Sequence, residues 1–261
     1  MELIELMTWA TLGCLPAFLL LDVVYQARKT RRPRLWRVRA AIVTVFAVGL
    51  SIALPTAWYR IVGEWSLFGL SGLGTLLGAA TGILVYKFIH YWYHRAIHRS
   101  DFLWRWFHQM HHSAESLDAW GAYYLSPLDA AMFISLGTVA FGPILGLSAS
   151  AAAVANLFIT FCAIFQHANL KTPVWLGYLI QRPESHGVHH ERGVHRYNYC
   201  DLPIMDMAFG TFKNPRVFDR ETGFYDGASA RIGEMLLGRD VSVPPYAGET
   251  VVEPVATRRA A

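Results

Sequence analysis

Long apolar segments alternate with short polar stretches through the first two thirds of the chain. Three of them, at about residues 3–24, 40–62 and 67–89, carry few charges. Each is long enough to cross a bilayer once as a helix, which takes about 20 apolar residues. A fourth apolar stretch, 128–167, is interrupted by a Gly-Pro pair and has just the length for two crossings. We expect it to form a hairpin that enters the bilayer and returns; a re-entrant hairpin that does not cross fully is the alternative.

The remainder of the chain is more polar. From Lys171 onward prolines and charged residues are frequent, which predicts a cap outside the bilayer rather than a further span. Residues 238–261 are rich in Pro, Val, Ala and charge, and we expect a flexible C-terminal tail there. We therefore predict one membrane-embedded domain at residues 1–237. Its fold class should be all-α, an integral membrane protein with four to five transmembrane helices.

Local signals place several helix ends. Gly63–Ser66 reads as a short turn before the third segment. Ser100 and Asp101 have the character of a helix start, so the preceding helix should stop near Arg99. Glu184-Ser185 is a possible start for a later helix. The third segment also carries glycines that would allow close helix packing, or that a membrane helix merely tolerates; these are Gly69, Gly72, Gly74, Gly78 and Gly82.

Composition and charge support the membrane prediction. Hydrophobic residues make up 54% of the chain and charged residues only 16%, with a mean hydropathy of +0.28. Such a chain is too apolar for an ordinary soluble domain. The net charge of +4 does not indicate nucleic acid, because seven basic residues gather after the first apolar segment. These are Arg28, Lys29, Arg31, Arg32, Arg34, Arg37 and Arg39.

A basic loop after a span is typical of the cytoplasmic side, where it faces anionic headgroups of membrane lipids. The N-terminus should then lie outside, and the cap and C-terminus should lie in the cytoplasm. The first segment is not expected to be a cleaved signal peptide, because Glu2 and Glu5 stand where a basic region would be needed.

Histidines carry the candidate chemistry. Nine of the eleven fall in two windows, His90–His112 and His186–His190, and the others are His167 and His195. Residues spaced by three or four share a helix face, so one helix can present several imidazoles together. Neutral imidazole is a common ligand of zinc, iron and copper. Eight or nine such ligands are too many for one ion, and two metals are the natural count.

The histidine runs resemble the fatty acid hydroxylase and sterol desaturase superfamily. The resemblance covers about residues 85–213 and is carried by YWYHRAIH, WRWFHQMHHS and SHGVHH. Cys200 stands where that family more usually has glycine, a departure that we do not expect to affect the metal site. The resemblance implies a dimetal centre in the cytoplasmic cap whose ligands are His94, His98, His108, His111, His112, His167, His186, His189 and His190. His90 and His195 lie outside the family's motifs, and we leave them out of the ligand set.

The resemblance also implies the activity. It predicts two iron ions, with zinc possible in the purified protein, and O2 as co-substrate. The reaction would hydroxylate or desaturate a C–H bond of a lipid taken from the bilayer. No residue beyond the metal ligands is assigned a catalytic role. The sequence has no G-x-G-x-x-G, haem-attachment or iron–sulfur cysteine pattern, so electrons should come from a separate electron-transfer protein. The three cysteines predict neither disulfides nor a thiolate metal site.

Two other functions remain open at this point. A membrane zinc hydrolase would usually mix carboxylates with imidazoles. A bis-histidine haem protein or a metal transporter would need paired histidines but not the H-x-x-H-H clusters. Four acidic residues near the histidines could orient ligands by hydrogen bonds, although such residues more often cap helices or face solvent. They are Glu115, Asp118, Asp129 and Glu184.

Overall fold

The computed structural model describes residues 2–30 and 32–244, so Arg31 and most of the predicted tail at 238–261 lie outside the described residues. Within this part the protein is all-helical, as predicted. The only β-type pairing among the described residues is one isolated bridge between Glu191 and Thr222. Of the predicted tail, only residues 238–244 are described, and they follow the last helix.

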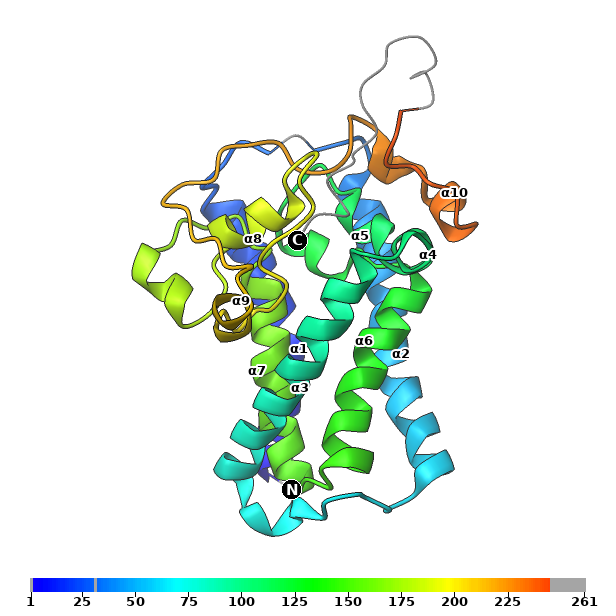
Figure 1. Cartoon of the computed structure of the whole chain (residues 1–261), viewed down its shortest axis with the longest axis vertical. Coiled ribbons are helices and arrows are strands. Elements are labelled where there is room, and N and C mark those ends of the chain that lie inside the picture. Colours follow the sequence, from blue (N-terminus) through cyan, green and yellow to red (C-terminus); the bar gives the residue numbers. More distant parts are fainter. Residues whose placement is uncertain (1, 31, 245–261) are drawn as a thin grey trace.

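Five long helices form an elongated bundle, running alternately up and down (Figure 1). Helix α1 packs against α7, α3 also packs against α7, and α2 packs against α6. The last long helix pair is the predicted hairpin, in which α6 is prolonged by a π-helical turn, η4. The bounds are α1 Glu2–Val24, α2 Trp36–Val62, α3 Thr75–Ile97, α6 Pro127–Val139, η4 Ala140–Ile144 and α7 Ala149–Phe165.

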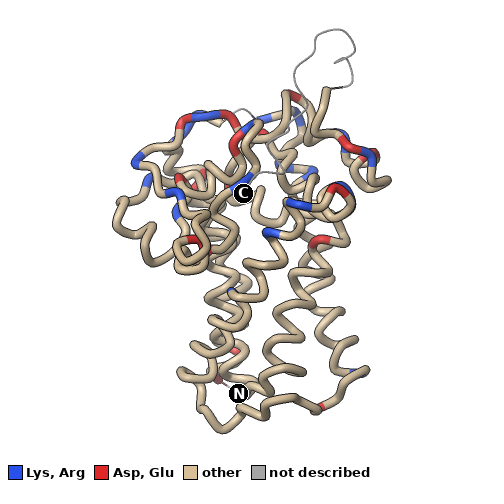
Figure 2. Tube along the Cα trace, in the orientation of Figure 1, with Lys and Arg blue, Asp and Glu red and all other residues tan. Residues whose placement is uncertain are grey.

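Short helices build a cap over one end of the bundle (Figure 1). Charged residues gather in this cap and are sparse along the long helices (Figure 2). Apart from η1 (Leu70–Leu73) and η4, which lie at the opposite end, the short elements all belong to the cap. They are α4 Asp101–Leu103, η2 Trp104–His108, α5 Gln109–His112, η3 Ala119–Tyr123, η5 Val174–Tyr178, α8 Pro183–His190, α9 Ile204–Ala208, η6 Ala228–Ala230 and α10 Ile232–Leu236.

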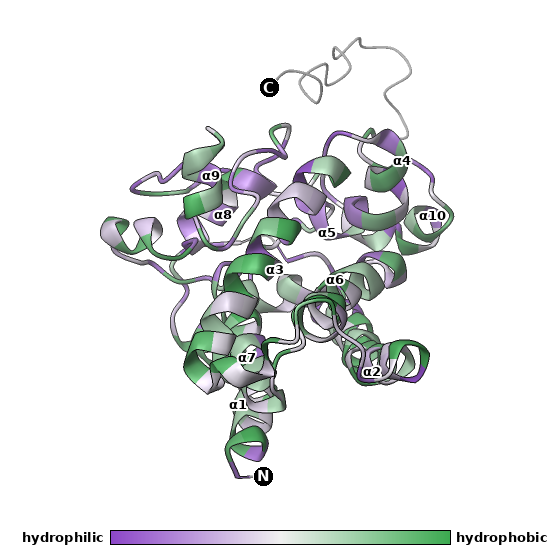
Figure 3. Ribbon diagram, turned by 60° about the horizontal axis from the view of Figure 1, so that its bottom comes forward, coloured by the Kyte–Doolittle hydropathy of each residue, from purple (hydrophilic) through white to green (hydrophobic). Residues whose placement is uncertain are grey.

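Three helices of the described chain are long and apolar enough to cross a membrane: α1, α2 and Pro127–Ile144. Helix α7 is apolar but shorter. Large apolar side chains of the first two spans face outward, and Ile61 for example is 77% exposed. Green, hydrophobic ribbon dominates the long helices (Figure 3). The protein is therefore a membrane protein, whereas the predicted number of four to five crossings stays a prediction.

Two predicted boundaries were wrong. Helix α2 begins at Trp36 instead of about Ala40, so Arg37 and Arg39 lie in its first turn and not in the loop. The third helix begins at Thr75 instead of about Leu67. The apolar residues before it form the connection between α2 and α3, which is longer than the predicted four-residue turn. Hydrophobicity alone does not separate such an apolar loop from a helix.

The apolar residues between α2 and α3 are not helical because their backbone N–H groups bond to another segment of the chain. These N–H groups donate to carbonyls at the tip of the α6–α7 hairpin, in the pairs Leu67–Pro143, Phe68–Ile144 and Leu70–Leu145. These bonds place the hairpin tip at the far end of the bundle, beside the α2–α3 connection. The hairpin therefore runs the length of the bundle, although a full membrane crossing stays a prediction.

The α3 glycines divide between two roles. Gly69, Gly72 and Gly74 belong to the connection and not to the helix. Gly82 lies in α3 against the hairpin, where an added Cβ would sit 2.7 Å from Leu147 Cδ1. The close-packing interpretation thus holds for the glycines inside α3, and Gly78 likewise faces Ala151.

Helix α1 is attached to the cap by one buried carboxylate. Asp22 Oδ2 accepts from Ala119 N at 2.5 Å, and its Oδ1 accepts from Asn169 N at 2.7 Å. Asn169 also bonds the backbone of Arg28 through its side-chain amide. The end of the first span is thereby tied to two cap segments that lie far from it in sequence.

We predict that Gly82→Leu lowers the free energy of unfolding by about 1–3 kcal/mol, because the new side chain overpacks the contact with Leu147. Gly49→Leu is the matched control, since nothing lies within 4 Å of a Cβ built at this glycine of α2. Thermal unfolding in detergent measures both. Equal melting temperatures for the two variants would contradict the packing described for α3.

Candidate metal centre

Four segments bring histidines to the junction between the bundle and the cap. The last turns of α3 carry His94, and His98 is the C-cap of this helix. The α4–η2–α5 segment carries the second histidine run, His167 follows α7, and α8 carries the last run. Ser100 caps the second segment as predicted, because its Oγ accepts from Leu103 N. Within that segment η2 is a π-helical turn, in which Gln109 N donates to Trp104 O, five residues earlier.

All nine predicted ligands lie in two compact, buried groups. In each group, one candidate donor atom per residue lies within 4.8 Å of every other. The first group, called here the five-histidine group, contains His94, His98, His108, His112 and His189. The second, the four-histidine group, contains His111, His167, His186 and His190.

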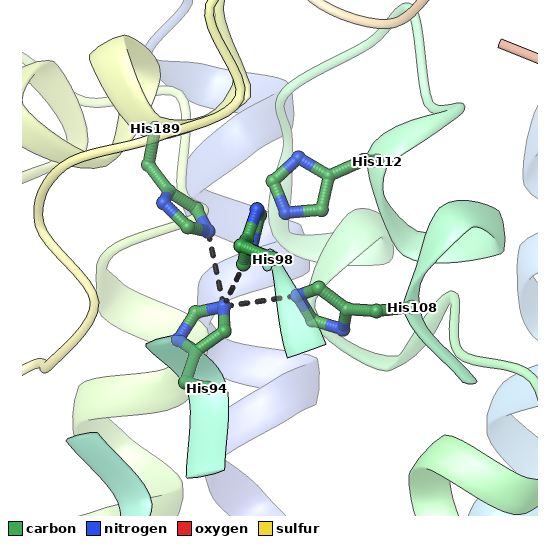
Figure 4. A group of neighbouring side chains, drawn as sticks. All are labelled: His94, His98, His108, His112 and His189. Atoms are coloured by element: carbon green, nitrogen blue, oxygen red, sulfur yellow. Dashed lines mark hydrogen bonds between the residues drawn. The ribbon is translucent and has the colours of Figure 1, made fainter. Parts of the chain in front are cut away.

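Ring nitrogens in the five-histidine group converge on one point. His94 Nε2 lies 2.9 Å from His108 Nε2, 3.1 Å from His189 Nε2 and 3.3 Å from His98 Nε2 (Figure 4). Two nitrogens bound to one ion at about 2.0–2.1 Å, with an angle of 90–110°, are about 2.9–3.4 Å apart. The observed spacings therefore match imidazoles around a single ion.

The four-histidine group has the same spacing. His167 Nε2 lies 2.9 Å from His186 Nε2 and 3.1 Å from His111 Nε2, and His190 Nε2 is 3.0 Å from His186 Nε2. The two groups are neighbours, because the rings of His112 and His190 stack with centroids 4.2 Å apart. The geometry thus supplies two adjacent metal positions.

The second ring nitrogen decides whether these short distances can be hydrogen bonds. His94 Nδ1 faces the Tyr199 carbonyl at 2.7 Å, and His189 Nδ1 faces the Tyr197 carbonyl at 2.7 Å. A carbonyl only accepts, so each Nδ1 must carry the proton and each Nε2 must hold a lone pair. His94 Nε2 and His189 Nε2 therefore turn lone pairs toward each other, and a cation between them is needed to hold them there.

The same argument applies to the four-histidine group. His167 Nδ1 donates to the Ala163 carbonyl at 2.7 Å, and His186 Nδ1 donates to Gln181 Oε1 at 2.5 Å. The Gln181 oxygen is fixed as the acceptor because its Nε2 donates to two backbone carbonyls. His167 Nε2 and His186 Nε2 thus present lone pairs to each other at 2.9 Å.

Burial favours the neutral, metal-binding form of these rings. Desolvation lowers the pKa of His189 and of His190 well below the ordinary value, and the neighbouring histidines lower it further. In addition, His112 Nε2 is buried and has no hydrogen-bond partner among the described residues. Neutral imidazoles with unused, convergent lone pairs fit a pair of metal ions.

Comparison with known proteins agrees with this site. The sequence model of the fatty acid hydroxylase family, described as "Fatty acid hydroxylase", matches residues 79–211, just over half of the chain. The chain belongs to the fatty acid hydroxylase family. Family membership and the histidine groups together indicate a membrane, metal-dependent lipid oxidase. Comparisons with curated proteins and with solved structures returned no match.

In this fatty acid hydroxylase family member, each H-x-x-H-H run contributes to both histidine groups. Residues four apart stay together, so His108 and His112 join one group while His186 and His190 join the other. The remaining histidine of each run, His111 or His189, enters the opposite group. From the sequence, the three histidines of each run were expected to lie together on one helix face. In the structure, each run is instead divided between the two groups. That all nine are ligands stays a prediction.

One of the four acidic residues contacts a predicted ligand. Asp129 Oδ2 lies 2.7 Å from His108 Nδ1, where it can hold the ring proton and orient the imidazole. The other three bond elsewhere: Asp118 to Trp36, Glu115 to backbone N–H groups near Gly227, and Glu184 to Thr172 and Arg182. Their role is to fix the cap.

Sequence reasoning missed most of the groups that orient the histidines. Four of the orienting acceptors are the carbonyls of Ala163, Tyr197 and Tyr199 and the amide of Gln181. A backbone carbonyl has no side-chain signature, so only Ala163, four residues before His167 on one helix, could have been anticipated. Gln181 lies five residues before the last run and matches no motif that we considered.

The two histidines left out of the ligand set have different surroundings. His90 lies one turn before His94, near a buried ion pair in which Lys87 Nζ is 2.5 Å from Asp201 Oδ2. His195 Nδ1 lies 3.1 Å from His112 Nδ1, so it contacts the centre although it belongs to no motif. Neither residue is part of the five- or four-histidine group.

The departure at Cys200 has a structural explanation. Its side chain is fully buried, with Sγ 3.7 Å from the Lys87 carbonyl, and its backbone N–H donates to Asp206. It therefore packs beneath the loop that supplies the Tyr199 carbonyl and stays outside both histidine groups.

We predict that Asp129→Leu weakens metal retention about 10–100-fold, because His108 loses the acceptor that holds its ring. The measurement is competition with a chelator, followed by metal analysis of the folded protein. Asp118→Leu is the control, since Asp118 is equally buried but bonds Trp36 and Ser116 instead of a histidine. Equal metal loss in both variants would mean that Asp129 acts only through general stability.

Proposed function

We propose that this protein is a membrane di-iron oxidoreductase that uses O2 and an external electron donor to hydroxylate or desaturate a lipid C–H bond. The observation that carries the proposal is the position of the two histidine groups. They close one end of a large cavity that runs into the apolar bundle, in a chain that belongs to the fatty acid hydroxylase family.

The cavity fits a lipid. Its volume is about 970 Å³, and its walls come from the long helices α1, α2, α3, α6 and α7. His94, His108, His111, His167 and His186 line its cap end. Helices α1 and α2 both contribute to the wall but share almost no contact with each other, and Figure 3 shows them apart. We propose that the lipid enters the cavity from the bilayer between these two helices.

Attack on an unactivated C–H bond requires activated O2. Two irons held by these groups would supply this activation. The chain contributes the surroundings that this chemistry needs. Hydrogen-bond acceptors keep the protons of His94 and His189 on Nδ1, so that both Nε2 atoms remain free for metal. The apolar cavity walls hold the lipid and exclude water from the reacting bond.

The alternatives explain fewer features. A zinc hydrolase site would usually include carboxylates, and neither histidine group contains one within the described chain. A bis-histidine haem site needs two facing imidazoles and leaves seven of the nine without a role. Iron is therefore our proposal for the native metal, although iron sites can acquire zinc on overexpression.

We propose that the cap and the histidines face the cytoplasm, where a separate electron-transfer protein can reach them. The basic residues after α1, among them Arg28, Lys29 and Arg32, support this orientation by the positive-inside rule. A reporter protein fused after Ala261 should therefore be located in the cytoplasm, so a reporter that functions only in the cytoplasm should be active. Activity on the outer side alone would reverse the proposed topology.

Replacement of a predicted ligand should abolish the reaction without preventing membrane insertion. We expect His189→Ala to lose lipid oxidation and the metal of the five-histidine group, because spans held by apolar packing do not depend on an imidazole at their rim. The assay is lipid product by mass spectrometry under ¹⁸O2, with iron content and membrane yield. Hydroxylation places the label in the lipid, whereas desaturation places it in water.

The control for this experiment is Glu234→Gln in α10, whose carboxylate pairs with Arg231 and contacts no histidine. This variant should keep both metal and activity. His195 belongs to no histidine motif, which would make His195→Ala an obvious control. It is less suitable than Glu234→Gln, however, because His195 contacts His112. Full activity of His189→Ala at normal yield would refute the proposed function.

A further inference from the structure

The apolar cavity has a polar position at its histidine end. Gln166 follows the last residue of α7, immediately precedes His167, and lines the cavity. It is only 9% exposed, and its Oε1 has no hydrogen-bond partner among the described residues. A buried carbonyl oxygen without a donor is costly, so such a group in a binding cavity is suited to a ligand that supplies the donor.

A second polar group lines the same cavity from α3. His90, one turn below His94, also lines the cavity, and its Nδ1 is buried without a hydrogen-bond partner in the described chain. Its ring packs against Tyr86 and Phe133. The histidine end of the cavity therefore presents two unused polar atoms close to the ligand groups, whereas the wall below is mainly apolar.

We propose that Gln166 binds a hydroxyl group of the lipid substrate, which places the polar end of the lipid beside the histidines and its hydrocarbon chain in the cavity below. This proposal rests on the proposed function and narrows its substrate class. The substrate is a lipid with a hydroxyl donor close to the carbon that is oxidised, and the reaction occurs near the polar end instead of at mid-chain.

The opposite orientation has its own candidate residue. Asn156 also lines the cavity but lies ten residues earlier on α7, roughly 15 Å further from the histidines along the helix. A lipid bound with its polar end away from the histidines would use Asn156 instead of Gln166. The two amides line the cavity at different depths along α7 and its C-cap, so they distinguish the two orientations.

The test measures binding and needs no turnover. Purified, iron-loaded protein in detergent is incubated with equal amounts of 1-hexadecanol and 1-methoxyhexadecane, and the retained lipids are counted by mass spectrometry against empty micelles. The ether cannot donate a hydrogen bond and carries one extra methyl group, so the effect of the donor is read from the change in preference between the wild type and Gln166→Leu. We expect the wild type to retain the alcohol in preference by roughly fivefold to tenfold, the effect of one hydrogen bond.

Gln166→Leu should remove the preference, and Asn156→Leu should leave it unchanged. Gln166→Met, which is nearly the same shape, replaces the leucine variant if that protein does not fold. No preference in the wild type, a preference that survives loss of Gln166, or a preference lost only in Asn156→Leu would overturn the proposal. These outcomes are independent of the His189→Ala result, which tests the oxidation itself.

Discussion

Convergent lone pairs are the constraint on which the rest of the structure depends. His94 and His189, like His167 and His186, have one ring nitrogen bonded to an acceptor and the other turned toward a neighbouring imidazole. Such rings repel one another unless positive charge lies between them. Binding of two cations at this junction would therefore hold the cap on the bundle, in addition to supplying reactivity. This would add to the apolar cluster around Trp36, Trp104 and Met235 and to the buried carboxylates that already fix the cap.

The cap loops are shaped to supply acceptors for these rings. Tyr197 and Asn198 both have positive φ, a conformation that few residues other than glycine adopt. Asn198 holds this turn through its side chain, which donates to Ser185 O and Lys213 O and accepts from Lys213 N. The turn aims the Tyr197 carbonyl at His189. Backbone strain in this loop is thus linked directly to ligand orientation.

A buried ion pair extends this linkage to α3. Lys87 lies on α3 two turns before His94, and Asp201 follows the Tyr199 carbonyl that orients His94. Breaking a buried pair leaves an uncompensated charge, so the two segments are strongly held together. The first histidine pair and the loop after the last histidine run therefore behave as one unit, which keeps His94 and His189 in register.

The sequence predicted what depends on side-chain type and spacing. The spans follow from apolar length. Eight of the nine candidate ligands lie in the histidine runs, His167 was added by the family resemblance, and the structure gathers all nine into two groups. The sequence did not show that η2 is a π-turn, nor how each run divides between the two groups. Those features depend on how separate segments meet, as with Gln181 and His186. The start of α3 was misplaced because Leu67 and Phe68 are as apolar in a loop as in a helix.

The division of the last histidine run has a consequence for the order of events during synthesis. His189 belongs to one group, while His186 and His190 belong to the other, and all three follow the long helices in the chain. The five-histidine group cannot be complete until His189 has been synthesised, and the four-histidine group cannot be complete until His190 has been synthesised. Asp22 likewise waits for Ala119 and Asn169, which are 97 and 147 residues later. The long helices are therefore synthesised before either histidine group can be complete, so the metal centre can form only late in synthesis.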